Sequence, residues 1–199
     1  MRPWHLVPSG SSFGRCRLGH VPEIPDATQR VIDAAARKGV ELKVTIFEQS
    51  THTAEDAARA VGGEVGQIVK SLVFVSDSLE GPEPCLVLAS GANTVDVALL
   101  AAVLTGPKLR RATADEAREL TGFSIGGIPP FGHKRQIRTV MDPDLGRYDV
   151  VWAAAGTSTA VFPLAPATLR MLSNAVVTPI AAGSTAPVSE QAAGASSGA

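Results

Sequence analysis

The most constraining feature of the chain is a pair of strand-like segments joined by a short stretch rich in glycine and proline. Residues 68–76 and 85–89 are dominated by β-branched and other apolar residues, and a glycine and two prolines lie between them. Two such segments separated by a turn predict an antiparallel β-hairpin. We therefore expect a β-sheet built around this hairpin at the centre of the fold.

Single helices and short strands alternate along the rest of the chain. Capping residues and apolar periodicity predict where helices begin, and period-two alternation predicts the strands. The expected helices begin near Asp26, Thr53, Val95, Thr113 and Pro166, and the further strands cover residues 42–47, 108–112, 137–141, 150–154, 159–162 and the region of Val176. This order predicts an α+β fold with a mixed sheet flanked by helices, and it argues against a doubly wound parallel fold.

A single domain, residues 26–182, is expected between two disordered tails. Residues 1–25 are rich in glycine, proline and serine without a period, and residues 183–199 are mostly alanine, glycine, serine and threonine. Both compositions are typical of terminal segments that bury no apolar surface. Hydrophobic residues make up 45% of the chain and charged residues 19%, which is enough to build a core in the central domain.

The same composition excludes several classes of protein. The longest apolar run, residues 97–104, is much shorter than the roughly 18 to 20 residues that a membrane-spanning helix needs. The N-terminal stretch lacks the continuous apolar segment of a secretory signal, and two cysteines provide no disulfide framework. We therefore expect a cytoplasmic protein with no membrane partner.

Positive charge is concentrated in one window of a chain whose net charge is −1. Residues 105–140 carry seven lysines or arginines against three acidic residues, a net charge of +4 that leaves −5 elsewhere. Such a window can bind a phosphate-bearing partner, although a solvated surface with scattered charges gives the same pattern.

Lys70 is the first residue with candidate chemistry. Alternation along the predicted strand places it on the same face as Leu72 and Phe74. An inward lysine loses its hydration unless its ammonium meets an anion, a carbonyl or a water-filled cleft. The alternative is a lysine that extends past the sheet edge or pairs with a buried acid such as Asp96, and the pattern leaves both interpretations open.

A glycine- and proline-rich loop at residues 126–133 is the second candidate. Gly127 and Gly132 allow a close backbone approach that a Cβ would block, and Pro129 and Pro130 stiffen the connection. A rigid, bare backbone can direct N–H groups at a carbonyl oxygen or a phosphate. The alternative is a stiff turn with no function.

Neither a metal nor a nucleotide cofactor is expected. His52 and His133 are far apart in the predicted domain and have no spacing typical of a zinc site. The glycine pair at residues 62–63 is not followed by the residues that bind phosphate in dinucleotide or P-loop motifs. Cys85 lies in a predicted core strand and is expected to be a small buried hydrophobe, although a thiol hydrolase using Cys85 with one of the histidines is a further alternative.

Three segments in this order resemble the YbaK family of aminoacyl-tRNA deacylases, which are related to the editing domain inserted in bacterial prolyl-tRNA synthetase. The segments are Thr-Ala-Glu-Asp-Ala-Ala at 53–58, Ile-Val-Lys-Ser-Leu-Val-Phe at 68–74 and Gly-Gly-Ile-Pro-Pro-Phe-Gly-His at 126–133. The similarity covers about residues 26–182 and includes a later Ala155-Gly156 pair. It implies a single α+β domain whose mixed sheet is curved.

The resemblance also implies a set of site residues. A strand lysine and a glycine-proline loop line the family's pocket. The corresponding catalytic positions are Lys70, Gly127, Pro130 and Gly132, and the substrate-binding positions are Ile128, Phe131, His133, Thr53, His52 and Gly156. Pro129 departs from the family, in which a small polar residue often precedes the loop's proline, and this departure bears on which aminoacyl group fits.

The implied activity is hydrolysis of a mischarged aminoacyl-tRNA, with cysteine or alanine on the proline tRNA as the expected errors. The enzyme needs no nucleophile of its own, because the ribose hydroxyl or the amino acid side chain assists, while Lys70 engages the terminal phosphate or oxygen. The expected partners are aminoacyl-tRNA and prolyl-tRNA synthetase, not DNA. The expected tRNA-binding residues are Lys108, Arg110, Arg111, Lys134 and Arg135. A module of the same fold that binds a tRNA end or a synthetase without catalysis is the alternative.

Overall fold

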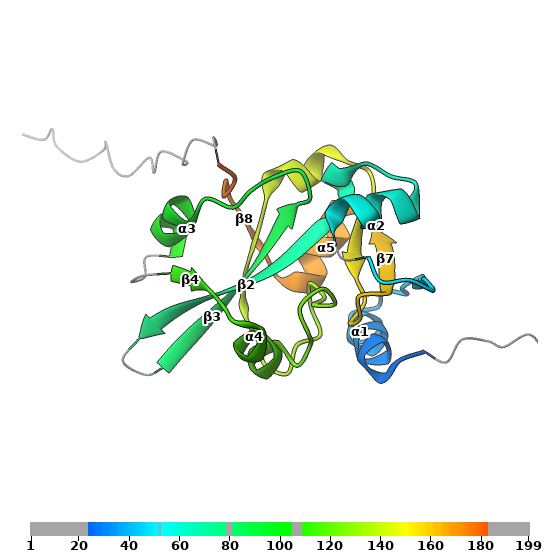
Figure 1. Ribbon diagram of the computed structural model, residues 1–199, viewed down its shortest axis with the longest axis horizontal. Coiled ribbons are helices and arrows are strands. Elements are labelled where there is room, and N and C mark those ends of the chain that lie inside the picture. The colour runs from blue at the N-terminus through cyan, green and yellow to red at the C-terminus, as the bar shows by residue number, and fades with distance from the viewer. Residues whose placement is uncertain (1–23, 52, 79–80, 105–108, 183–199) are drawn as a thin grey trace, which may run out of the picture.

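The computed structural model describes residues 24–51, 53–78, 81–104 and 109–182, and these form five α-helices and eight strands (Figure 1). The helices are α1 (Asp26–Ala36), α2 (Ala54–Val61), α3 (Val97–Leu104), α4 (Ala114–Thr121) and α5 (Pro166–Ser173). The strands are β1 (Thr45–Ile46), β2 (Val69–Ser78), β3 (Gly81–Ser90), β4 (Leu109–Arg111), β5 (Arg138–Met141), β6 (Val151–Ala154), β7 (Ala160–Leu164) and β8 (Val176–Val177). The predicted α+β class is confirmed.

The strands form two sheets. The larger sheet has the order β4-β2-β3-β5-β8, and its centre is the predicted antiparallel β2–β3 hairpin, in which Lys70 lies opposite Ala89. Strand β5 runs parallel to β3, and β8 runs parallel to β5, so this sheet is mixed. The smaller, antiparallel sheet has the order β1-β7-β6. A bridge between Ile68 and Trp152 joins the two sheets. The sequence analysis predicts a single mixed sheet, so the division into two sheets differs from the prediction.

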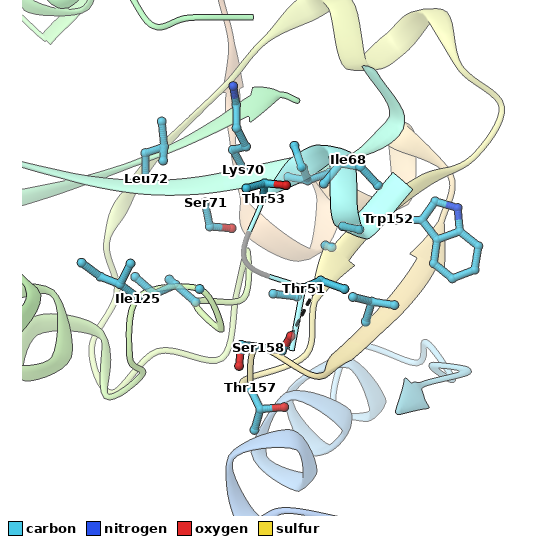
Figure 2. A pocket seen from close by; sticks show the side chains of 18 of the residues that line it. Thr51, Thr53, Ile68, Lys70, Ser71, Leu72, Ile125, Trp152, Thr157 and Ser158 are labelled. Atoms are coloured by element: carbon cyan, nitrogen blue, oxygen red, sulfur yellow. Dashed lines mark hydrogen bonds between the residues drawn. The ribbon is translucent and has the colours of Figure 1, made fainter. Parts of the chain in front are cut away.

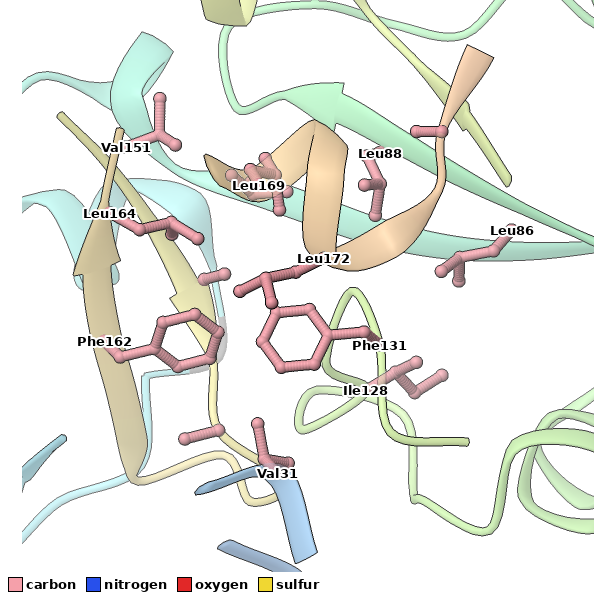
Figure 3. Packing of buried hydrophobic residues seen from close by; sticks show 14 of the residues in the cluster. Val31, Leu86, Leu88, Ile128, Phe131, Val151, Phe162, Leu164, Leu169 and Leu172 are labelled. Atoms are coloured by element: carbon pink, nitrogen blue, oxygen red, sulfur yellow. The ribbon is translucent and has the colours of Figure 1, made fainter. Parts of the chain in front are cut away.

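The middle of β2, residues 73–75, and the second half of β3, residues 85–90, are buried on both faces. One face contributes Leu86 and Leu88 to the main core, which also contains Phe162 from β7 and Leu172 from α5 (Figure 3). The ring of Phe131 packs on Phe162 in this core, with the ring centroids 5.7 Å apart. The opposite face forms a second cluster that includes α3. The hairpin is therefore a rigid central layer to which the remaining elements are attached.

The helix boundaries follow local capping chemistry. Thr113 forms the predicted capping box with Glu116 at the start of α4. At the start of α2, where a capping box of Thr53 with Asp56 is also predicted, only one half is present: the Thr53 side chain accepts a hydrogen bond from the Asp56 N–H. Asp26 differs from the prediction, since it is the first residue of α1 and the preceding proline occupies the cap without a side-chain hydrogen bond. The N–H of an N-cap residue makes no helical hydrogen bond, so a proline is tolerated there.

Two strands differ in extent from the prediction. Strand β1 keeps only two residues of the predicted 42–47, because only Thr45 and Ile46 pair with β7. Gly81, Pro82 and Pro84 lie inside β3 rather than in the turn. Strand β5 starts beside β3 only at Cys85. These prolines therefore lie where β3 has no described strand neighbour on that side, and they lose no ladder hydrogen bond to one.

Some predictions concern residues outside this description. The predicted tails, apart from residues 24 and 25, are among them, as are His52 and Lys108. In the part of the chain that the structure describes, no helix is both long enough and apolar enough to cross a membrane.

Candidate active site

A cavity of about 560 Å³ lies beside β2 where the two sheets meet. On this edge β2 pairs with β4 only at residues 74–76, and the Ala112 N–H then donates to the Val73 carbonyl. The next contact is the Ile68–Trp152 bridge to β6. Between these points, residues 70–72 of β2 have a described strand neighbour only on the β3 side. We call residues 70–72 the open edge of β2.

The cavity wall is mostly apolar. Alanine, valine, isoleucine and leucine side chains from α2, β2, β6 and β7 form most of it, together with Ile125, Gly126 and Ile128. Its polar side chains are Thr51, Thr53, Lys70, Ser71, Arg111, Thr157 and Ser158. No histidine, cysteine or carboxylate lines it among the described residues. The described lining therefore offers hydroxyls and two cations, but none of the side chains that usually act as a general base.

Lys70 is held at the cavity by main-chain carbonyls. It shares a strand face with Leu72 and Phe74, as predicted, and its Nζ donates to the carbonyl oxygens of Gly91, at 3.1 Å, and Asn93. Burial lowers the pKa of this ammonium, an effect that nearby carboxylates partly oppose. Figure 2 shows the Lys70 and Ser71 side chains on opposite sides of the β2 ribbon.

The suggested pairing of Lys70 with Asp96 is wrong. The Oδ1 atom of Asp96 accepts hydrogen bonds from the N–H groups of Ala98, at 2.8 Å, and Leu99, at 3.2 Å, at the start of α3. A carboxylate satisfies free N–H groups at a helix start, so the helix competes successfully for this side chain.

A buried carboxylate fixes the turn that holds Lys70. The Nδ2 atom of Asn93 donates to Oδ2 of Asp142 and to Oδ2 of Asp144, both at 2.8 Å. Asp142 is 1% exposed, and it also accepts from the Ser90 N–H at 3.2 Å. Asn93 and Asp142 therefore position the carbonyls that bind Lys70. Sequence reasoning missed both, because an asparagine and an Asp-Pro pair suggest only turns.

The loop 126–133 contributes only its first part to this cavity. Gly126 and Ile128 line it, whereas Gly127 packs against the neighbouring loop so closely that a Cβ would lie 2.6 Å from Cα of Thr157. Gly132 has φ +83°, and a Cβ there would lie 3.3 Å from that of Ala34 in α1. Gly127 therefore allows the loop to pack closely on the loop at Thr157, and Gly132 allows it to pack closely on α1.

The rest of the loop lines a second cavity of about 410 Å³, to which Pro130, Phe131, Gly132 and His133 contribute. Lys38, Lys134, Arg135 and Asn174 also line it. The Nζ atom of Lys38 donates to the carbonyl of Leu172 at 2.7 Å. His133 is hydrogen-bonded through Nε2 to the Pro129 carbonyl at 2.8 Å, and burial lowers its pKa. This second cavity is polar and carries basic side chains.

The remaining predicted residues are dispersed. Gly156 packs against α1, where a Cβ would lie 2.6 Å from the Ala27 carbonyl oxygen. Arg111 lines the first cavity. Arg110 instead donates from both terminal nitrogens to the Glu116 carboxylate, each at 2.8 Å. These hydrogen bonds help lower the pKa of the Glu116 carboxyl to about 2.

Cys85 lies in β3, in the buried cluster that includes α3, and lines neither cavity. Burial raises the pKa of its thiol to about 11. A thiol of that pKa is protonated near neutral pH and is a poor nucleophile. This geometry does not favour the thiol hydrolase alternative.

The chain is also similar to proteins of known family and fold. Residues 48–172 match the model of the aminoacyl-tRNA editing domain family. A crystal structure described provisionally as a trans-editing enzyme for prolyl-tRNA synthetase is 45% identical, with a TM-score of 0.74 over 81% of this chain and 100% of that one.

Two curated bacterial proteins are also similar to the chain. ProXp-y of Escherichia coli, named a multifunctional Ser/Thr-tRNA deacylase, is 30% identical over 64% of this chain and 77% of its own length. EbsC of Enterococcus faecalis, named provisionally a Cys-tRNA(Pro)/Cys-tRNA(Cys) deacylase, is 28% identical over 61% of this chain and 73% of its own length.

Proposed function

Because the chain belongs to the aminoacyl-tRNA editing domain family, we propose that it is a hydrolase that removes wrongly attached amino acids from tRNA. The cavity beside β2 is the proposed site of the aminoacyl ester. Its volume of about 560 Å³ lies in the range of roughly 300–1,000 Å³ that is typical of small-molecule sites, and it exceeds what one amino acid needs. The ester can therefore enter together with part of the terminal nucleoside.

The observation that carries the proposal is the chemistry of the cavity wall. Apolar side chains, hydroxyls and a carbonyl-bound lysine line it, and none of its described residues is a histidine, cysteine or carboxylate. An aminoacyl ester is already activated, and its neighbouring ribose hydroxyl or its own side chain can assist cleavage. Such a reaction needs orientation and charge stabilisation from the protein more than it needs a nucleophile.

Lys70 is the proposed source of that charge stabilisation. Two carbonyls hold its ammonium in place, so little reorganisation is needed when negative charge develops on the ester or lies on the terminal phosphate. Gly126 and Ile128 are the loop residues placed to contact the ester. The proposed roles of Pro130, Phe131, Gly132 and His133 in substrate binding are indirect, because these residues line the second cavity.

The proposed substrates are cysteinyl- and alanyl-tRNA(Pro). A synthetase pocket built for proline cannot strongly exclude smaller amino acids, because a missing methylene is worth only about 1–3 kcal/mol, and a second site must remove the error. EbsC, named provisionally for cysteinyl esters, and the structural relative named for prolyl-tRNA synthetase support this choice. We propose that prolyl-tRNA synthetase is a partner and that the activity is cytoplasmic, where aminoacyl-tRNA is used.

Exposed cations near both cavities are proposed to bind the tRNA backbone. Arg111 lines the first cavity, and Lys134 and Arg135 lie at the second. Hydrolysis at low substrate concentration should weaken steeply as salt rises, because each phosphate contact displaces counterions. A flat salt response would instead assign recognition of the tRNA to the synthetase.

Release of labelled amino acid from alanyl-, cysteinyl- and prolyl-tRNA(Pro) tests the proposed function. We expect the protein to hydrolyse at least one of the first two esters and to spare the correctly charged prolyl ester. Binding of tRNA with no hydrolysis of any ester would overturn the enzymatic proposal in favour of a non-catalytic module.

A further inference from the structure

Ser71 carries a buried hydroxyl that has no hydrogen-bond partner in the described part of the chain. Two other buried hydroxyls share this property there, on Thr28 and Ser50, but neither of those lines the cavity beside β2, whereas Ser71 does. Figure 2 shows the Ser71 side chain directed into the space bounded by Ile125, Thr51 and Ser158. A buried polar atom without a partner is costly unless a ligand supplies one.

The main chain of Ser71 also faces the cavity side of the strand. The Val73 carbonyl accepts from Ala112 on the β4 side, while the Ile68 carbonyl accepts from Gly91 on the β3 side. Residues two apart in a strand direct their N–H and C=O groups to the same edge. Ser71 is two residues before Val73, so its N–H and C=O point to the open edge of β2.

Three of the four other hydroxyls that line the cavity already have a hydrogen-bond partner within the protein, and the fourth belongs to Ser158. The side chain of Thr51 donates to the Ser158 carbonyl at 3.1 Å, and the hydroxyls of Thr157 and Thr159 are 3.2 Å apart. The hydroxyl of Thr53 caps α2. Ser71 thus combines two main-chain groups that face the open edge with a hydroxyl that has no partner in the described part of the protein and that must rotate toward the cavity to meet a ligand.

We propose that Ser71 determines which amino acid the enzyme removes. Its Oγ hydrogen-bonds to the hydroxyl or thiol of a short polar side chain, and its main-chain carbonyl accepts from the α-ammonium that every aminoacyl ester carries. An alanyl ester would leave Oγ buried without a partner. Alanyl esters are therefore the slower substrates and seryl and cysteinyl esters the preferred ones, an assignment that rests on the proposed deacylase function.

The test compares Ser71→Ala with Thr28→Val, which removes a buried unpartnered hydroxyl in α1 away from the cavity. Single-turnover deacylation of seryl-, cysteinyl- and alanyl-tRNA(Pro) is measured for each protein. The unmodified protein should favour the polar esters about tenfold, the size of one neutral hydrogen bond. Ser71→Ala should lose that preference because seryl and cysteinyl hydrolysis slow more than alanyl hydrolysis, and Thr28→Val should keep the preference.

The conservative variant Ser71→Thr, which keeps a hydroxyl, should retain the preference and so separates recognition from folding. Equal slowing of all three esters in Ser71→Ala, or an unchanged ratio, would overturn the assignment of Ser71 while leaving the deacylase function intact. An alanyl preference in the unmodified protein would overturn it as well. Hydrolysis of none of the esters by the unmodified protein would overturn the proposed function itself.

Discussion

The two cavities on either side of the loop 126–133 differ in size, lining and charge. The first, about 560 Å³, has mostly apolar walls and a lysine bound to carbonyls. The second, about 410 Å³, is lined by basic residues, Lys38, Lys134 and Arg135, together with polar residues that include Gln136, Thr139 and Asn174. One continuous motif thus faces two chemically different environments, and only its first part lines the cavity proposed for the aminoacyl ester.

The largest contrast is expected between two lysines with similar hydrogen bonds. Lys70 and Lys38 each donate to main-chain carbonyls, but Lys70 lines the first cavity and Lys38 the second. Lys70→Ala should lower kcat/KM for deacylation about 100-fold or more, the usual cost of a lost preorganised charge. Lys38→Ala should leave kcat/KM within about twofold. Equal losses would remove the functional distinction between the cavities.

A smaller contrast is expected between two glycines of the loop. In Gly127→Ala the new Cβ would meet the main chain of Thr157, so the segment lining the first cavity must shift. We expect about 1–3 kcal/mol of destabilisation together with at least about tenfold lower activity. Gly132→Ala, at φ +83°, should cost about 1–2 kcal/mol of stability without lowering activity per folded molecule.

Urea unfolding and deacylation assays on the same preparations measure both effects of these glycine variants. Full activity in folded Gly127→Ala would contradict the placement of the ester beside Gly126 and Ile128. A loss of activity in folded Gly132→Ala would extend the functional site to the second cavity.

The smallest expected effect is a pH dependence confined to the second cavity. Burial lowers the pKa of His133, so the unfolded chain binds a proton there more readily than the folded one. The free energy of unfolding should therefore fall as the pH drops below about 6.5, the ordinary pKa of histidine in the unfolded chain. It should continue to fall until the pH passes the lower pKa of His133 in the folded protein. Urea midpoints between pH 5 and pH 8 measure this, and His133→Gln should be less sensitive to acid.

The pH dependence expected from Glu116 lies in a different pH range and can be told apart from that of His133. Its folded pKa of about 2 means that its contribution to stability is lost only at much lower pH. An identical pH profile in His133→Gln would show that burial of this imidazole does not govern the acid sensitivity.

Local sequence patterns predicted the local parts of the fold. The cap at Thr53, the capping box at Thr113 and the β2–β3 hairpin each depend on residues close together in the chain, and all three are present. The parallel placement of β5 and β8 was not predicted. Pairing between distant segments depends on how the whole chain packs, and periodicity within one segment does not encode it.

The site was predicted less completely for a similar reason. Lys70 could be identified because a lysine on an apolar strand face breaks a pattern. Ser71 could not, since a serine in a strand is unremarkable until the structure leaves its hydroxyl buried without a partner. The sequence also does not show which cavity each loop residue lines. Pro130 lines the second cavity, although the motif groups it with Gly127.

The open edge of β2 bears on how the protein avoids self-association. Exposed strand edges present unpaired main-chain groups on which another chain can add a strand, and such edges promote aggregation. Beside the cavity, the stretch of β2 without a described partner on this edge covers only residues 70–72, with β4 on one side and the bridge to Trp152 on the other. A gap this short excludes a whole strand, yet it admits the N–Cα–C=O unit of one amino acid, which is the part that all aminoacyl esters share with a polypeptide.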